Sequence, residues 1–171
     1  ITIHLHKGEE QEASEYFSSV FFANMIMAAV FLLPAIVVIV FIDRMFQVPV
    51  GVLSDVQILW AFVFLNFFIS IITSVFSTST YSMNRLELSS VATIIAEFVR
   101  IGFLYVAYRF FPAYLFYLGI ASVVSTTVMA IANAGFTKKL LPDIKITPKN
   151  FRWKKVIELV SLGAWNSVTR L

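Results

Sequence analysis

Long apolar segments alternate with short polar ones along most of the chain. Four such segments cover residues 17–42, 56–83, 88–111 and 114–136, and only the third contains Asp, Glu, Lys or Arg. About 20 apolar residues are needed for a helix to cross the hydrocarbon core of a bilayer. Each segment therefore predicts a membrane-spanning helix, and the short connections predict that successive helices are antiparallel neighbours.

Composition supports the same interpretation. Apolar residues make up 59% of the chain and charged residues 13%, whereas globular domains average about 25% charged residues. We expect an all-α integral membrane bundle. The sequence has no cysteine, which excludes disulfides and thiolate metal sites. It starts at Ile1 and ends inside a helix-like stretch at Leu171, so we expect it to be an internal part of a longer protein.

Basic residues predict the orientation of the spans. Seven Lys and Arg residues follow the fourth span, between residues 138 and 155, whereas the links after the first and third spans carry little positive charge. Positive charge concentrates on cytoplasmic loops, so the region after the fourth span is expected to be cytoplasmic. Residues 1–142 then form one four-span unit. Residues 143–171 are expected to form a cytoplasmic connector, an amphipathic surface helix and the start of a fifth span.

Three of the predicted spans carry polar residues on one face, because residues three and four apart lie on the same side of a helix. Such stripes could line a shared, hydrated cavity. They could equally be contacts between helices, since Ser and Thr often hydrogen-bond between membrane helices. The candidate cavity-lining residues are Asn66, Ser70, Thr73, Thr93, Glu97, Arg100, Ser122, Thr126 and Asn133.

Glu97 and Arg100 stand in the middle of the third span. A charge at mid-membrane costs on the order of 3 kcal/mol and nearly always faces a bundle interior or water. Spaced three residues apart, the two side chains can neutralise each other. They are either a structural ion pair or a functional one. In the functional case Arg100 contacts an anionic group, and Glu97 holds Arg100 in place or accepts a proton.

Other chemistry finds little support in the residues. No glycine-rich phosphate loop or zinc spacing appears, and no base stands beside a nucleophile. The basic run is explained by topology and by anionic lipid headgroups and does not indicate nucleic-acid binding. His4 and His6 form too small a set for a metal site. We therefore expect a non-enzymatic protein without a metal or organic cofactor, for which H⁺ or Na⁺ is the conceivable coupling ion.

Three stretches carry a family resemblance: ITIHLHKGEEQEASEYFSS at the start, YSMNRLELSSVATIIAEFVRIG in the middle and TKKLLPDIKITPKNFRWKKVIELVSLGAWNSV at the end. The last combines a basic connector, a surface helix and a Gly-x-Trp-Asn-Ser opening at Gly163, Trp165, Asn166 and Ser167. Together they resemble the multidrug/oligosaccharidyl-lipid/polysaccharide exporter superfamily, in its polysaccharide biosynthesis, O-antigen-type flippase branch.

The resemblance implies that the four spans are helices three to six of a transporter of twelve or more helices, built from two pseudo-symmetric halves. Residues 1–6 would end the second helix. Alternating access would move a polyprenyl-pyrophosphate-linked oligosaccharide across a bacterial or archaeal cytoplasmic membrane. Partners would be that lipid, bulk membrane lipids, and a polysaccharide polymerase and glycosyltransferases. Arg100 would match the cationic cavity common in the branch, whereas Glu97 departs from a purely cationic lining.

Two alternatives stay open at this point. One is a cation-coupled multidrug antiporter of the same superfamily, in which Glu97 is the proton or sodium site and Arg100 regulates its pKa. The other is a non-transporting scaffold for polysaccharide enzymes, in which the polar stripes are dry helix contacts.

Overall fold

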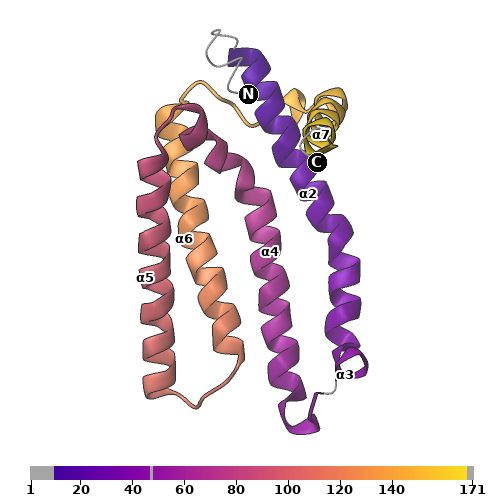
Figure 1. Cartoon of the computed structure of the whole chain (residues 1–171), viewed down its shortest axis with the longest axis vertical. Coiled ribbons are helices and arrows are strands. Elements are labelled where there is room, and N and C mark those ends of the chain that lie inside the picture. Colours follow the sequence, from indigo (N-terminus) through magenta and orange to yellow (C-terminus); the bar gives the residue numbers. More distant parts are fainter. Residues whose placement is uncertain (1–9, 47, 169–171) are drawn as a thin grey trace.

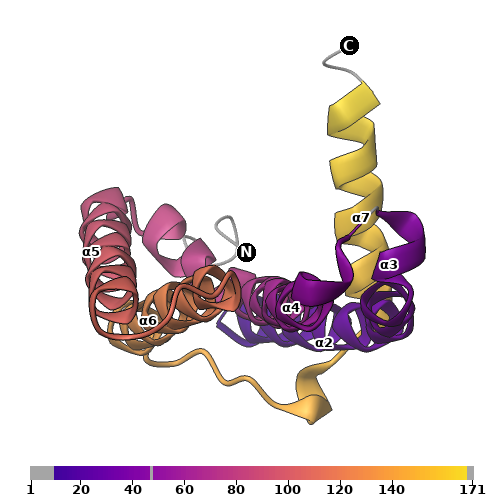
Figure 2. The same ribbon diagram turned by 90° about the horizontal axis from the view of Figure 1, so that it is seen from below.

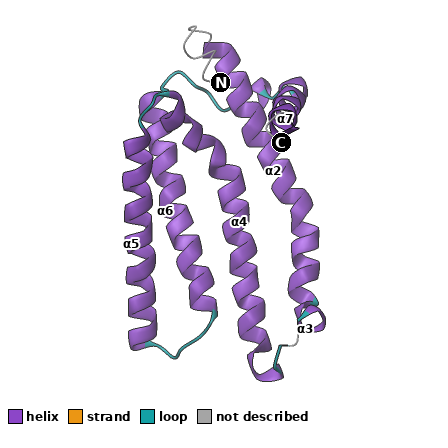
Figure 3. Cartoon of the chain, viewed as in Figure 1, coloured by secondary structure: helices purple, strands orange, loops and turns teal. Residues whose placement is uncertain are grey.

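The computed structural model describes residues 10–46 and 48–168, and this part consists of helices joined by loops (Figure 3). Four long helices dominate it: α2 (Glu10–Val40), α4 (Leu53–Ser82), α5 (Leu86–Phe110) and α6 (Phe116–Leu140). All four are long and apolar enough to cross a membrane. The prediction of an all-α membrane bundle with four spans is confirmed.

Shorter helices lie between and after the spans. The short helix α3 (Ile42–Met45) and the 3₁₀ turn η1 (Val50–Val52) link α2 to α4. After α6 come the 3₁₀ turn η2 (Pro148–Asn150) and helix α7 (Trp153–Val168). The expected surface helix and the expected entry to a further span form one continuous helix through Gly163. The expected end of a preceding helix at residues 1–6 lies outside the described residues.

The four spans stand in a curved row rather than a closed bundle (Figures 1 and 2). Their order in space is α2, α4, α6, α5, and each packs mainly on its neighbour in that row. The spans alternate in direction as expected, but α4 and α5 scarcely touch although a tight turn joins them. Helix α6 lies between them and packs extensively on both.

Large apolar side chains cover the outer surfaces of the spans. Leu33 of α2 and Phe98 of α5, for example, are 71% and 72% exposed. The buried positions are instead mostly small residues such as Ala35, Ala96 and Ala121. This inside-out distribution suits lipid, because association between membrane helices relies on small residues and close packing rather than on hydrophobic burial.

The tightest packing joins α4 to α6 at Gly119. A Cβ at this position would lie 2.6 Å from Cβ of Phe62 and 3.2 Å from the backbone oxygen of Leu59. Only a residue without a side chain lets the two backbones approach this closely. Gly119 therefore sets the separation between the central pair of helices.

Asp55, at the start of α4, caps the start of α6. Its two carboxylate oxygens accept hydrogen bonds from the backbone N–H groups of Leu115, at 2.7 Å, and Phe116, at 3.1 Å. The first N–H groups of a helix have no partner within the helix, and a carboxylate also suits the positive end of its dipole. The cap ties α6 to α4 at the end opposite the α4–α5 turn (Figure 1).

A tight turn at Asn84 reverses the chain between α4 and α5. Asn84 has φ 50°, in the left-handed region that Asn tolerates better than most residues. The N–H of Asn84 donates to Tyr81 O and that of Arg85 to Thr80 O, the pattern of a Schellman helix end. Asn84 thus closes α4.

Three buried serines on α2 hold the connector between α6 and α7. The Ser18 hydroxyl donates to the backbone oxygen of Lys145, whose N–H donates to Ser14 Oγ at 3.3 Å. The N–H of Arg152 donates to Ser19 Oγ at 2.9 Å. Because these bonds satisfy backbone groups of an irregular segment, they fix the start of α7 against α2.

A charged cluster around Lys155 strengthens this attachment. The Lys155 ammonium lies 3.8 Å from a carboxylate oxygen of Glu12 and 4.1 Å from the centre of the Tyr16 ring. Burial opposes the charge on Lys155, but the Tyr16 hydrogen bond and the carboxylates of Glu12 and Glu158 outweigh it and raise the Lys155 pKa. The raised pKa means that the charged form of Lys155 is the one this cluster stabilises.

We predict that Gly119→Ala destabilises the protein by about 1–3 kcal/mol, because the added methyl group overpacks the α4–α6 contact. Gly135→Ala is the matched control on the same helix, since a Cβ there meets nothing within 4 Å. It should be neutral or stabilising by up to about 1 kcal/mol. Thermal unfolding in detergent, followed by circular dichroism, measures both; equal melting temperatures would contradict the packing argument.

Removal of the helix cap should also destabilise the protein. Asp55→Ala leaves two N–H groups at the start of α6 without their acceptor, at an expected cost of about 1–2 kcal/mol. Asp43→Ala, at an exposed carboxylate in α3, should stay within about 0.5 kcal/mol of the parent. Hydrogen exchange of the α6 N-terminal amides adds a local readout, and unchanged protection in Asp55→Ala would refute the capping role.

Candidate functional site

A polar groove lies where α4, α5 and α6 meet. Its volume is about 380 Å³. Helix α6 forms its floor because this helix fills the space between α4 and α5, which stand apart along most of their length. The residues that line the groove are Ser70, Thr73, Ser74, Ser77, Thr93, Ala96, Glu97, Ser125, Thr126, Met129, Ala130 and Asn133.

Six of the nine predicted cavity residues lie in this lining, and they come from all three predicted stripes. They are Ser70 and Thr73 on α4, Thr93 and Glu97 on α5, and Thr126 and Asn133 on α6. The other three, Asn66, Arg100 and Ser122, are not part of the lining. The spans thus turn polar faces toward one shared groove, while three of the predicted residues stand outside it.

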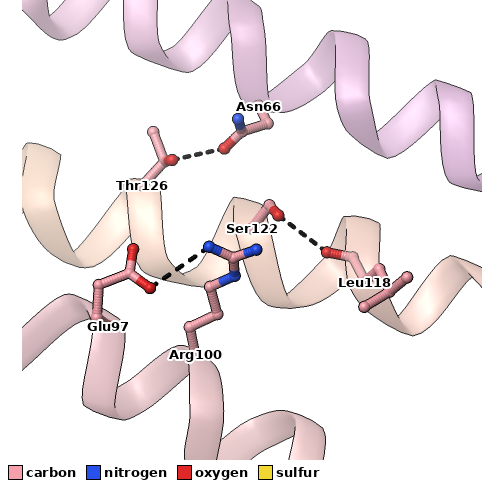
Figure 4. A network of polar contacts seen from close by, with 6 residues as sticks. All are labelled: Asn66, Glu97, Arg100, Leu118, Ser122 and Thr126. Atoms are coloured by element: carbon pink, nitrogen blue, oxygen red, sulfur yellow. Dashed lines mark hydrogen bonds and ion pairs between the residues drawn. The ribbon is translucent and has the colours of Figure 1, made fainter.

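Asn66 joins two helices. Its side-chain oxygen accepts a hydrogen bond of 2.5 Å from the Thr126 hydroxyl, across the α4–α6 contact (Figure 4). The Thr137 hydroxyl makes a second link between these helices through Phe76 O and Ser79 Oγ, both at 3.0 Å. Part of the polar pattern on α4 and α6 is therefore contact between helices, as the alternative interpretation of the stripes required.

Ser122 forms a local bond within α6. Its hydroxyl donates to the backbone oxygen of Leu118 at 2.9 Å (Figure 4). Such bonds to the preceding turn are common for Ser and Thr in membrane helices, because they satisfy the hydroxyl without another helix. The placement of Ser122 needs no ligand to explain it.

Glu97 and Arg100 form the predicted ion pair on α5. Arg100 Nη1 lies 3.4 Å from Glu97 Oε2, and the Arg100 and Glu97 side chains are 41% and 50% exposed. In Figure 4 both side chains extend from α5 toward α6, with the guanidinium near Ser122. Of the two, only Glu97 borders the groove. Because the contact is long and open, the guanidinium is free to bind another anion beside the groove.

Several lining residues were not among the predicted site residues. Ser74 and Ser77 lie on α4, four residues after Ser70 and Thr73. Ser125 belongs to a row on α6 with Ala121, Met129 and Asn133, at intervals of four residues. The row mixes small, apolar and polar residues, so a search for polar periodicity alone passes over it. Burial of Ala121 and Ser125 shows that this row faces the neighbouring helices.

Asn133 is the most enclosed polar residue of the groove. The residue is 6% exposed, and its side-chain oxygen is buried with no hydrogen-bond partner among the described residues. A buried acceptor that lacks a donor is costly. Within the described ranges no group of three or more His, Asp or Glu residues comes close enough to hold a metal ion; His4 and His6 lie outside those ranges.

Comparison with known proteins gives a distant relative. Over 166 residues the chain is 25% identical to the uncharacterized membrane protein EpsK of Bacillus subtilis (strain 168), an alignment that covers 97% of this chain and 33% of that protein. The chain thus spans about a third of the length of the curated relative it matches. No family model matches the chain, and no solved structure does. Together with the four apolar helices, this relative indicates a multi-pass membrane protein.

Proposed function

We propose that the chain belongs to a flippase that moves a polyprenyl-pyrophosphate-linked oligosaccharide across the cytoplasmic membrane by alternating access, for cell-surface polysaccharide synthesis. The observation that carries this proposal is the polar groove between α4, α5 and α6, with the Arg100 guanidinium beside it. Ionisable side chains within spans are rare and commonly mark transport pathways. A scaffold of dry helix contacts needs no such groove.

The charge pair suits an anionic cargo that must be released again. A guanidinium can bind phosphate oxygens through two parallel hydrogen bonds. Arg100 is held by Glu97 at 3.4 Å, beyond the length of a strong charge-assisted bond, and is 41% exposed. A diphosphate could therefore displace Glu97 at small cost, and Glu97 would reclaim the guanidinium after release.

The basic end of the molecule supports the orientation that the proposal needs. The start of α5, the end of α6 and helix α7 all lie at the upper end of the long helices in Figure 1. The basic residues there are Arg85, Lys138, Lys139, Lys154 and Lys155. This end would face the cytoplasm and its anionic headgroups. The polymerase and glycosyltransferases of the same pathway would be functional partners, with membrane lipids around the spans.

We expect Arg100→Ala to slow flipping by about tenfold or more, because a hydrogen-bonded charge contact to the diphosphate is lost. The protein is reconstituted in vesicles with a fluorescent polyprenyl-pyrophosphate-linked oligosaccharide. A membrane-impermeant reductant then bleaches the outer leaflet, and the rate at which protected label becomes accessible measures flipping.

Arg109→Ala is the matched control for this measurement. Arg109 lies on the same helix, is exposed and rests over its neighbour Phe110, away from the groove. Its removal should leave the rate within about twofold of the parent, as expected for a surface change. Equal rates for Arg100→Ala and the parent, at equal amounts of protein, would refute the role of Arg100 in transport.

A cation-coupled antiporter is the second candidate, and one observation favours it. The charged side chain that borders the groove is Glu97, not Arg100. Carboxylates within membrane spans commonly serve as binding sites for a transported proton or Na⁺. In this case the groove would carry the coupling ion or a cationic drug.

Glu97→Gln separates the two candidates, because the amide keeps the shape of the side chain and removes its charge. For the antiporter, dye efflux driven by a proton or sodium gradient should fall at least about tenfold in vesicles. For the flippase, lipid flipping should persist, since the oxygen of the introduced amide can still hold Arg100. Gradient-driven efflux that survives Glu97→Gln would eliminate the antiporter mechanism assigned to this residue.

A further inference from the structure

Most hydroxyl groups that line the groove donate their hydrogen bond to another atom of the protein. Those of Thr73 and Ser77 donate to backbone oxygens at 2.7 Å, and that of Thr93 donates to Ser89 O at 2.9 Å. Ser74 donates to Ile71 O, and Thr126 to Asn66. A hydroxyl has one proton and two lone pairs. The Ser74 oxygen already accepts one hydrogen bond, from Asn24 Nδ2 at 3.1 Å. The five oxygens therefore retain lone pairs that can accept hydrogen bonds from a ligand in the groove.

Asn133 adds a buried acceptor to the same surface. Its side-chain oxygen has no donor among the described residues, although the residue is 6% exposed and borders the groove. Ser70 and Ser125 carry the remaining hydroxyls of the lining, and each of these can donate or accept a hydrogen bond. Acceptors thus outnumber donors, and the most enclosed acceptor requires a donor from outside the described part of the chain.

Charge and size narrow the class of ligand. Phosphate oxygens are acceptors and carry negative charge. The groove has few donors for them, and it contains the Glu97 carboxylate, which repels an anion. A single cation is also a poor fit, because a volume of about 380 Å³ lies in the range of small-molecule sites. Within the cargo of the proposed flippase, the uncharged part with many O–H groups meets both requirements. Sugar rings have this chemistry.

We propose that the groove binds the sugar rings of the cargo through their hydroxyl donors, with Asn133 as the specificity-determining acceptor. The diphosphate stays outside the groove, at Arg100. This assignment rests on the proposed flippase for the identity of the cargo and adds which part of it each residue contacts. The two parts of the cargo thus bind at different places. The sugar hydroxyls donate to side-chain oxygens of α4, α5 and α6, and the diphosphate contacts the Arg100 guanidinium.

The absence of cysteine in the chain permits a direct test. Ser77→Cys places a thiol in the groove of the protein in lipid nanodiscs, and an uncharged maleimide labels it. The labelling rate is measured with the methyl glycosides of glucose, galactose, mannose and N-acetylglucosamine, and with sodium pyrophosphate. A comparison of NaCl with choline chloride tests the effect of Na⁺. We expect at least one glycoside to slow labelling and pyrophosphate and Na⁺ to leave it unchanged. Ser161→Cys, exposed on α7, should be insensitive to all probes.

Substitution of Asn133 tests the assigned acceptor. In the Ser77→Cys background, Asn133→Leu should weaken protection by the glycoside about tenfold, because one hydrogen bond to a buried acceptor is lost. Asn133→Asp retains an acceptor oxygen at the same place and should preserve protection. Gel filtration and the melting temperature of each variant establish that it is folded, and Asn133→Ala, which also removes the oxygen, replaces Asn133→Leu if that variant does not fold.

Three results would overturn the inference: no protection by any glycoside, protection by pyrophosphate or Na⁺ in place of a glycoside, or protection that is equally strong with and without the Asn133→Leu substitution. These outcomes are independent of lipid flipping. Flipping without glycoside protection would remove the sugar site and leave the proposed function standing. Glycoside protection without flipping would do the reverse.

Discussion

The contact between α4 and α6 is the constraint on which the other features depend. Gly119 lets the two backbones approach, and Asp55 together with the Asn66–Thr126 bond fixes their register. Because α6 takes this place against α4, α5 can pack only on α6. The groove exists because α4 and α5 are held apart along most of their length, even though a single tight turn joins them. Its shape therefore follows from helix order rather than from the lining residues.

The polar residues of the spans divide into two groups according to where their protons go. Thr126 donates across the α4–α6 contact. The Thr137 hydroxyl lies within hydrogen-bond distance of Phe76 O and Ser79 Oγ on α4 and of Asn133 O on its own helix, so both residues link the two helices. Thr73, Ser77 and Thr93 donate to their own helices and leave lone pairs in the groove. Thr126 belongs to the first group and also lines the groove. Contact between helices and cavity lining are thus compatible roles within one stripe.

Local periodicity was sufficient to predict the spans, because hydrophobicity and length alone decide whether a helix crosses a bilayer. It also placed Thr73, Thr93 and Asn133 on polar faces, since their spacing is a property of a single helix. The order of helices in space is different, because it depends on pairwise packing that chain proximity does not fix. The cap at Asp55 joins residues about 60 positions apart, and no local pattern signals such a pair.

Periodicity placed Arg100 on the correct face of α5 but could not show that it stands beside the groove rather than in it. A helix face is broad, and Glu97 and Arg100 are three positions apart on α5, so one can border the groove while the other stands at its side. This offset changes the meaning of the charge pair. Two opposite charges inside the groove would cancel, whereas here the carboxylate and the hydroxyl oxygens make the groove acceptor-rich, and the guanidinium lies beside it. The site is therefore polarised across one helix, with a guanidinium at its edge next to a surface rich in hydrogen-bond acceptors.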